Sequence, residues 1–496
     1  MKHARLAIVL GLLGAGCSEP PPPVAPPPPP PAPVATAPAN STGIDRSRLP
    51  SPDPVIAWAP PAPNVSTLSN GIRVWHAQWG DLPVVSLLAV IPRGSETDPK
   101  GKAGLSYLMA DMLDEGAGSR SALELSEALQ RLATDYSASA SVDYTLLSMD
   151  MLAENLGASL DLLADMVRRP RFDAAEFKRR KDYFIAQALA SESDPRSAQD
   201  AAVLNVLFGE GYAGSVDEGT RTSLKAITLA DAKAHYKNSL VPEGVEFVVV
   251  GGIDQASVFK ELERVFGDWK GLAKTTAREL AEASTEHGVY LVDFPGAAQS
   301  VLSVVRRAEG ANTDKYFPAM VMNRSFGEAF TSRVNLNLRE DKGYTYGARS
   351  TFQRYRDAGY FTISAAVKSE TTRASIDEML KELSMTCSSK PLTARERDES
   401  VSGLLLGYPG RFERVSSVGA SFASLAIFDR PVNWYQTWPA AVEAVTLAQA
   451  NQIASEYCDP TKFSIVLAGD RAKLAETLAT LNRTLVGYDA QGKRLP

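Results

Sequence analysis

The feature that most constrains the fold is an internal repeat with an offset of 218 residues. The repeat is visible in two segments that share a Thr-Leu start, a helical stretch, a short loop, an apolar run and a glycine: "ITLADAKAHYKNSLVPEGVEFVVVGGID" and "VTLAQANQIASEYCDPTKFSIVLAGD". Thr446 follows Thr228 by 218 residues, and Gly469 follows Gly251 by the same offset. Equal offsets at both ends indicate a duplicated domain.

Both copies contain strand patterns and helix patterns. The strands expected in the first copy are 71–78, 84–94 and 138–152, and its helices are 101–116, 121–136, 155–170 and 173–191. The strands expected in the second copy are 287–296, 299–310 and 358–368, and one helix is 371–385. Thr228 and Thr446 are typical helix N-caps. Because strands and helices do not alternate one for one, the pattern predicts an α+β fold with helices covering one face of a sheet.

A chain of 496 residues is too long for one ordinary hydrophobic core, so several domains are expected. We predict five parts: a signal peptide (1–17), a Pro-rich tether (18–65), an N-terminal domain (66–275), a linker (276–285) and a C-terminal domain (286–484). The stretch 20–39 is so rich in proline that it predicts a stiff polyproline II spacer, with a ligand for a Pro-binding module as the alternative. The folded body is expected to begin near Leu68.

The first 17 residues have the pattern of a targeting segment. A basic start with Lys2 and Arg5 precedes an apolar run that is too short to span a bilayer. The run ends in "LLGAGC", which resembles a bacterial lipoprotein signal and would make Cys17 the lipidated N-terminus, although Gly14 stands where leucine is usual. We therefore expect a lipid-anchored protein on the periplasmic side of a bacterial envelope, at the outer membrane more than the inner. An ordinary secretory signal with a chance cysteine is the alternative.

Net charge and cysteine content bear on the possible partners of the chain and on its disulfides. The net charge is −6 and the basic residues are spread rather than clustered, so no nucleic-acid partner is expected. Besides Cys17 the chain has two cysteines, Cys387 and Cys458. Outside the cytoplasm they could form a disulfide, but the sequence leaves their pairing open.

Three motifs and the repeated endings carry a resemblance to a known family. The motifs are "LSNGIRV", "IPRGSETDPKGKAGLSYLMADMLDEGA" and "FTSRVNLNLREDKGYTYGARS". Together they resemble the insulinase/pitrilysin family of zinc metallopeptidases, which includes processing-peptidase subunits and respiratory-complex core proteins. The resemblance covers residues 66 to about 480. It implies two homologous α+β domains, each with a mostly antiparallel sheet and helices on one face, which form half of a clamshell around unfolded peptides.

The resemblance also shows what this chain lacks. Active members carry H-x-x-E-H on the helix after the Gly-Leu pair, with a further glutamate ligand on a later helix. Two imidazoles one turn apart hold zinc, and the glutamate takes a proton from the zinc-bound water. The corresponding positions here are Tyr107, Ala110 and Asp111, with the distal glutamate position near Gln187. We therefore expect this chain to bind no zinc.

No other residues rebuild the metal site in the sequence. The chain has four histidines, which are isolated from one another along the chain: His3, His76, His235 and His287. Asp111, Asp114 and Glu115 form an acidic group, which usually marks a solvated helix end. A residual metal near Asp111 is the alternative that the sequence leaves open.

The second copy keeps a different part of the family's chemistry. "LREDKGYTY" retains Arg339 and Tyr346 in the family's spacing. The resemblance implies that this pair holds the substrate carbonyl and stabilises its oxyanion, a task that suits guanidinium and phenol donors. The alternative is structural: Arg339 would cap a carboxylate and Tyr346 would be a half-buried strand residue.

These observations predict a zinc-free subunit of a heterodimeric metallopeptidase. The resemblance implies a zinc-bearing paralogous partner, so zinc is expected in that partner and no cofactor in this chain. Unfolded peptides are the expected substrates, bound in extended form by strand addition to a sheet edge. The alternatives are a non-enzymatic peptide-binding or scaffold protein of the same fold, and a decayed monomer.

Overall fold

The computed structural model of the protein describes residues 58–282 and 286–496. The predicted signal peptide, Cys17 and the Pro-rich stretch 20–39 lie outside the described residues. None of the helices in the described ranges combines the length and the apolar composition that a membrane-spanning helix requires.

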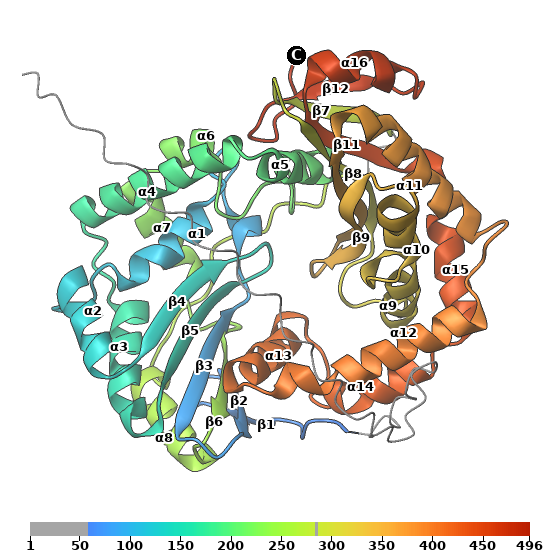
Figure 1. The fold of residues 1–496 in the computed structure, drawn as a ribbon. Helices are drawn as coiled ribbons and strands as arrows, with labels where there is room; N and C mark the ends of the chain where they lie inside the picture. Colours follow the sequence, from blue (N-terminus) through green and yellow to red (C-terminus); the bar gives the residue numbers. More distant parts are fainter. Residues whose placement is uncertain (1–57, 283–285) are drawn as a thin grey trace, which may run out of the picture. The chain divides into compact units, whose positions relative to one another are not determined.

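The first half of the described chain forms one sheet with its helices (Figure 1). Its strands are β1 (Asn64–Thr67), β2 (Arg73–Gln78), β3 (Val84–Ile91), β4 (Asp135–Ala140), β5 (Thr145–Leu152) and β6 (Glu246–Gly251). Its α-helices are α1 (Leu105–Asp111), α2 (Ala122–Arg131), α3 (Leu156–Arg168), α4 (Ala174–Glu192), α5 (Pro195–Phe208), α6 (Arg221–Ala226), α7 (Leu229–Ser239) and α8 (Gln255–Phe266).

The second half repeats this combination of a sheet and helices. Its strands are β7 (Val289–Asp293), β8 (Gln299–Ala308), β9 (Thr345–Arg354), β10 (Gly359–Lys368), β11 (Ser464–Gly469) and β12 (Leu485–Tyr488). Its α-helices are α9 (Tyr316–Asn323), α10 (Arg333–Asn335), α11 (Thr372–Thr386), α12 (Ala394–Gly407), α13 (Val415–Ile427), α14 (Trp434–Glu443), α15 (Leu447–Tyr457) and α16 (Arg471–Ala479). Two π-helices, Arg324–Glu328 and Leu336–Asp341, flank α10.

Five of the six strands follow the same order in the two sheets. The first runs β1-β2-β6-β3-β5-β4 and the second runs β12-β7-β11-β8-β10-β9. In each sheet one central pair, β2 with β6 or β7 with β11, is parallel, and the next three pairings are antiparallel. The sixth strands differ, because β1 pairs antiparallel with β2 whereas β12 pairs parallel with β7. The predicted α+β class with two homologous domains is therefore confirmed.

The residues that revealed the repeat have equivalent roles in the two halves. Thr228 and Thr446 each cap a helix, and each forms a capping box with the residue three positions later. Gly251 and Gly469 each end a strand at a place of close approach. A Cβ on Gly251 would lie 2.1 Å from the carbonyl oxygen of Val84, and a Cβ on Gly469 would lie 2.8 Å from Ser300 Oγ.

The structure corrects one strand and two helix boundaries. Residues 138–152 are not a single strand but a hairpin of β4 and β5, closed by a bond from Ser141 N to Tyr144 O of 2.8 Å. The alternation of side chains continues on both strands, and the turn has no glycine or proline, so the pattern hid the reversal. The helix predicted at 121–136 ends at Arg131, and the one predicted at 101–116 starts only at Leu105, after Gly104 with φ +91°.

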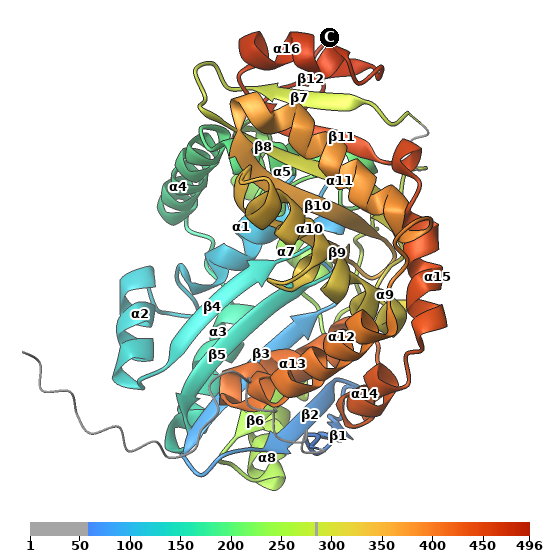
Figure 2. The same ribbon diagram turned by 45° about the vertical axis from the view of Figure 1, so that its right-hand side comes forward.

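Each sheet is buried on both faces, and one of those faces is covered by a helix from the other half. In the first sheet, side chains such as Leu87 and Val249 pack against α3 and α8. On the opposite face, α13 of the second half packs on β3 and β6, and a Cβ on Gly419 would lie 2.7 Å from Leu88 Cδ1. In return α5 of the first half packs on β7, β8 and β11 (Figures 1 and 2). Neither half buries its sheet alone.

The hairpin turns at equivalent places in the two halves also touch. The carboxylate of Asp143, between β4 and β5, accepts a hydrogen bond of 2.7 Å from the backbone nitrogen of Arg356, between β9 and β10. It also accepts one from the hydroxyl of Tyr212. Burial raises the pKa of Asp143, and these donors oppose that rise.

The ends of the ordered elements differ from the expected limits. β1 lies before Leu68, where we expected the folded body to begin, and β12 lies beyond residue 484. Cys387 and Cys458, whose pairing the sequence left open, form a disulfide with a Cα–Cα distance of 5.9 Å. This bond joins the C-terminal ends of α11 and α15.

Candidate functional site

The helix at the former zinc position is held rigidly at its N-terminus. The carboxylate of Asp98 accepts hydrogen bonds from the backbone nitrogens of Gly104 (2.9 Å), Leu105 (3.1 Å) and Ser106 (2.8 Å). Burial raises the pKa of Asp98 to about 6, and these donors oppose the rise, because the first amide groups of a helix lack internal partners. The helix that would present a zinc motif is therefore intact.

The first two positions of the motif have become part of the packing. Tyr107 is half-buried, and its ring meets that of Phe184 on α4 edge-on at a centroid distance of 5.6 Å. Burial raises the pKa of Tyr107, so its hydroxyl stays protonated at neutral pH and is a poor metal ligand. Ala110 is fully buried and has no group that could accept a proton.

Asp111, at the second histidine position, is bound by an arginine. Arg180 of α4 donates from Nε to Oδ2 at 2.6 Å and from Nη2 to Oδ1 at 2.5 Å. The same guanidinium lies 3.4 Å from a carboxylate oxygen of Glu115, which also accepts from Arg179. A bidentate arginine saturates a carboxylate that a metal would need. The residues present therefore do not fit a zinc ion.

The remaining candidates agree with this description. Gln187, at the distal glutamate position, is exposed on α4 and donates to the hydroxyl of Tyr183. His76 is buried, with Nε2 3.0 Å from the carbonyl oxygen of Ile253, and His235 is buried beside Ser106. Within the described ranges, no group of three or more His, Cys, Asp or Glu side chains is placed to hold a metal ion.

Arg180 was missed in the sequence, although a signal for it existed. It precedes Gln187 by seven residues, which places the two on the same face of α4. In a chain whose zinc motif lacks histidines, an arginine on the helix face of the expected metal ligand indicates a counter-charge for the acidic residues at that site. The acidic residues near Asp111 require a counter-charge, and this requirement is the signal that points to Arg180.

In the second half, Arg339 and Tyr346 are accessible. Arg339 lies in the π-helix Leu336–Asp341, and its guanidinium is 4.6 Å above the ring of Phe330 and 3.2 Å from a carboxylate oxygen of Glu340. Tyr346 lies near the start of β9 with 93% of its surface exposed, and is not the half-buried residue of the structural alternative. Both side chains can therefore meet a ligand that approaches from outside the chain.

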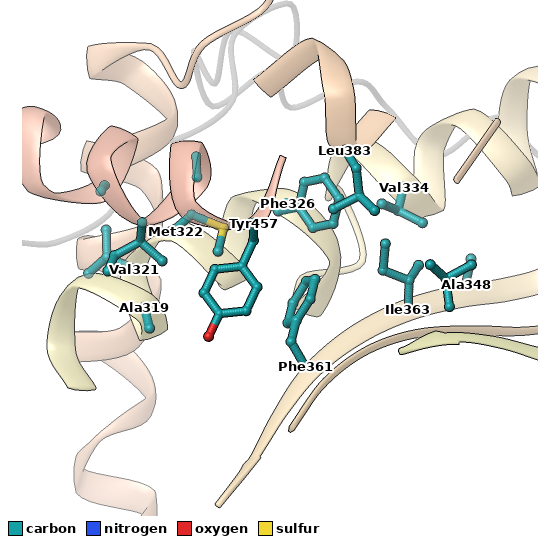
Figure 3. Close-up of a cluster of buried hydrophobic side chains, with 14 of the residues drawn as sticks. Ala319, Val321, Met322, Phe326, Val334, Ala348, Phe361, Ile363, Leu383 and Tyr457 are labelled. Atoms are coloured by element: carbon teal, nitrogen blue, oxygen red, sulfur yellow. The ribbon is translucent and has the colours of Figure 1, made fainter. Parts of the chain in front are cut away.

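A buried asparagine ties together the two segments that carry these side chains. Asn335 donates from Nδ2 to the carbonyl oxygen of Phe330 (2.6 Å) and accepts at Oδ1 from the backbone nitrogen of Ala348 (3.1 Å). Figure 3 shows the apolar cluster under this region, in which Phe326 and Phe361 lie with Val334, Ile363 and Ala348. The scaffold of Arg339 and Tyr346 is thus fixed, while the ring of Tyr346 is exposed and the guanidinium of Arg339 contacts Phe330 and Glu340.

The outer edge of β9 is partly closed to another strand. β10 occupies its other edge. The outward-facing nitrogen of Ala348 is bound by Asn335, and the outward-facing oxygen of Ser350 accepts from Asn323 Nδ2 at 3.1 Å. An added peptide strand would need these backbone groups. Strand addition at this part of β9 is therefore disfavoured.

The two sets of residues remain separate in this chain. Among the described residues, no hydrogen bond or ion pair joins Tyr107, Asp111 or Gln187 to Arg339 or Tyr346. The first set contains no group able to activate water. The second set contains two hydrogen-bond donors suited to negative charge.

Comparison with known proteins places the chain in a family. Residues 82–215 match a family model described as "Insulinase (Peptidase family M16)", and residues 226–404 match one described as "Peptidase M16 inactive domain". A relative from Bacillus subtilis, "Uncharacterized zinc protease YmxG", is 25% identical over 334 residues, which cover 67% of this chain and 80% of the relative. "Uncharacterized zinc protease Rv2782c" of Mycobacterium tuberculosis is 22% identical over 379 residues, covering 75% and 86%.

Solved structures share the fold. The crystal structure of a peptidase M16 inactive domain from Pseudomonas fluorescens superposes with a TM-score of 0.76 at 21% identity, covering 82% of this chain and 98% of that one. A protease from Helicobacter pylori gives a TM-score of 0.73 at 18% identity, with the same two coverages. A chain of Complex III2 from Candida albicans gives 0.68 at 15% identity, covering 83% and 97%. The chain thus belongs to the insulinase family of peptidases, as a member without the zinc motif.

Proposed function

We propose that this chain is the zinc-free subunit of a heterodimeric metallopeptidase and acts with a zinc-bearing paralogue. In this proposal the partner holds the metal and activates water. Arg339 and Tyr346 donate hydrogen bonds to the carbonyl oxygen of the peptide as negative charge develops on it. Proteins of the same family that are described as zinc proteases make such a partner plausible.

One contrast carries the proposal. The zinc position of the first half is closed by the pair of Asp111 and Arg180, whereas Tyr346 in the second half is 93% exposed. A tyrosine with no packing role and a neighbouring arginine on a fixed scaffold suit binding of a ligand from outside. A chain that acted alone would need a general base, and Ala110 stands at its position.

The substrates proposed are unfolded peptides in extended form. Asn323 and Asn335 disfavour strand addition at the middle of β9, so the backbone contacts of a peptide must lie elsewhere. Arg339 and Tyr346 would then contact the scissile region, and other surfaces would hold the rest of the peptide.

The test compares three samples with a quenched fluorescent peptide: this chain alone, a zinc-bearing paralogue from the same genome alone, and the mixture. The proposal expects turnover only, or far more strongly, in the mixture, and loss of turnover on chelation. Cleavage by this chain alone that a chelator abolishes would overturn it.

A second candidate function is a peptide-binding scaffold without catalysis. Its support is that Glu340 and Phe330 already contact the Arg339 guanidinium. The double variant Arg339→Ala/Tyr346→Phe separates the two candidates. Turnover by the assembled complex should collapse with assembly intact if the pair is catalytic, and should stay unchanged if the chain is a scaffold.

We further propose that the protein is lipid-anchored at Cys17 and faces the periplasm, with the outer membrane favoured. The disulfide between Cys387 and Cys458 supports an oxidising compartment, because such bonds are rare in the cytosol. Membrane fractionation with metabolic labelling by a fatty-acid analogue tests this. The Cys17→Ala variant should lose both the label and membrane association, and retention of both would contradict the anchor.

A further inference from the structure

A cavity in the second half has a lining with unusual chemistry. It has a volume of ≈ 370 Å³ and lies beside α9, the end of β9 and the start of α14. Three arginines line it, Arg354, Arg411 and Arg430, together with aromatic residues that include Tyr316 and Phe352. A volume of this size suits one or two peptide residues, within the range of small-ligand pockets.

The three arginines of this cavity have no direct ion pair within the described residues. Among the described residues, no carboxylate lies within ion-pair distance of Arg354, Arg411 or Arg430. Glu328 is the acidic residue of the lining, and it already receives Arg324 at 3.4 Å and the amide of Asn323 at 3.5 Å. The chain as a whole is acidic, with a net charge of −6, so this concentration of arginines is a local feature.

Two of the arginines are held in place by other contacts. The guanidinium of Arg430 lies over the rings of Tyr316 (4.7 Å) and Trp434 (4.5 Å), and its Nε has no hydrogen-bond partner in the described part of the chain. Arg354 donates to the carbonyl oxygens of Glu309 and Gly310, both at 3.1 Å. Burial lowers the pKa of Arg354; the nearby Glu309 carboxylate opposes this effect and the charge of Arg430 adds to it.

Fixed guanidinium groups of like charge around a partly buried cavity repel one another, and an anion would remove that repulsion. Arginine binds a carboxylate through two parallel hydrogen bonds, and the aromatic walls suit the apolar atoms beside it. We propose that this cavity binds a carboxylate of a peptide, either its C-terminal group or an acidic side chain.

The position of the cavity suggests its use, and this step rests on the proposed function. β9 carries Tyr346 near one end and Arg354 at the other. Eight residues of an extended strand span roughly 26 Å. A peptide whose scissile carbonyl met Tyr346 would therefore need about eight extended residues to bring a carboxylate to the cavity, on a path that does not pair with the middle of β9, and the cavity would select substrates by that distance.

The binding test uses this chain alone, so it does not depend on a partner or on catalysis. Three dye-labelled octapeptides of Gly, Ser and Val are compared by fluorescence anisotropy: one with a free C-terminus, one amidated, and one amidated with an internal glutamate. The free acid should bind at least tenfold more tightly than the amide. The glutamate peptide shows whether a side-chain carboxylate serves as well.

The decisive variant is Arg411→Gln, because the Arg411 side chain makes no hydrogen bond or ion pair among the described residues and its loss should leave the fold intact. It should weaken carboxylate binding about tenfold and leave the amide peptide unchanged. The matched control is Arg349→Gln, an exposed arginine on β9 that does not line the cavity.

Three outcomes would overturn the proposal: equal binding of the acid, glutamate and amide peptides; no effect of Arg411→Gln; or an equal effect of Arg349→Gln, which would indicate general attraction. Binding as expected without turnover in the mixture of subunits would refute the proposed function alone. Turnover without selective binding would refute the carboxylate pocket alone.

Discussion

The two halves of this protein share one architecture but differ in the chemistry at their surfaces. In the first half, α1 is the helix expected to carry the zinc motif. Its Tyr107 and Ala110 are packed against neighbouring residues, and its Asp111 is bound by Arg180. In the second half, Arg339 and Tyr346 stand accessible on a fixed scaffold. Five strands follow the same order in both sheets, so the strand order does not account for the difference in surface chemistry.

Under the proposed function, this contrast is that of a duplicated fold whose first half has lost one activity and whose second half keeps another. A metal site needs several ligands at once. A single arginine bound to one ligand position, as Arg180 is to Asp111, therefore excludes the ion. The pair of donors needs only exposure and a rigid base, which Asn335 and the cluster in Figure 3 provide. Matched substitutions in the two halves can therefore test this difference.

The largest expected effect is on catalysis by the complex. Arg339→Ala/Tyr346→Phe should lower kcat by roughly 10²-fold or more, because one oxyanion donor alone is worth about 10²–10³ in rate. Tyr107→Phe in the first half should leave kcat unchanged, since its hydroxyl takes no part. Turnover of a quenched peptide by the mixed subunits measures both. A comparable loss with Tyr107→Phe would remove the functional distinction between the halves.

The next largest effect is expected on stability, at α13 and α5, the two helices that each cover the sheet of the other half. Phe422 of α13 and Phe208 of α5 are fully buried between the halves. Replacing either by alanine should cost about 3–5 kcal/mol of unfolding free energy. Each substitution should also lower the stability of both halves together, because each half covers the other's sheet. Urea unfolding followed by hydrogen exchange in each half measures this.

The control for that prediction is Leu406→Ala on α12, whose side chain is 53% exposed and whose loss should cost less than about 0.5 kcal/mol. If Phe422→Ala destabilised one half while the other kept its unfolding midpoint, the two halves would be independent domains. The exchange of helices would then have no energetic consequence.

The duplication, the α+β class and most elements could be predicted because they depend on local patterns and equal offsets. The exchange of α5 and α13 could not, because an amphipathic helix pattern does not say which sheet its apolar face will meet. The pair of Asp111 and Arg180 was missed for a similar reason: its partners are 69 residues apart. The exposure of Tyr346 contradicts the alternation of β9, because residues on its face such as Ala348 and Ser350 are buried.

Breaking the ion pair between Arg180 and Asp111 in the first half should lower the free energy of unfolding. Arg180→Ala leaves the carboxylate of Asp111 without its partner in a half-buried place and leaves Glu115 with Arg179 alone, at an expected cost of about 3 kcal/mol. Arg339→Ala in the second half should cost less than about 0.5 kcal/mol, because its contacts are exposed. Urea midpoints with unchanged m-values measure both, and Asp111→Ala added to Arg180→Ala should recover part of the loss.

A buried carboxyl of the first half predicts a pH dependence. Burial raises the pKa of Glu96 from 4.5 to about 8, so between these values the folded chain binds more protons than the unfolded chain. The unfolding free energy contributed by this group therefore falls as pH rises from about 4.5 through 8. Glu96→Gln, which can still accept the hydrogen bond from Gly94, should gain stability relative to the parent as pH rises from 5 to 9. Parallel pH profiles would show that Glu96 is ionised throughout.

The smallest expected effect is the loss of stability on removing the helix caps Thr228 and Thr446, the two residues that revealed the repeat. Thr228→Ala and Thr446→Ala each remove a cap whose hydroxyl oxygen accepts from a backbone nitrogen at 3.2 Å, and each should cost about 1 kcal/mol. The two boxes differ in charge, because Asp231 completes the first and pairs with Lys102, whereas neutral Gln449 completes the second. High salt should therefore weaken the first box more than the second. Thermal unfolding at low and high salt measures the difference, and an equal salt dependence would mean that the paired charge adds nothing to the shared capping geometry.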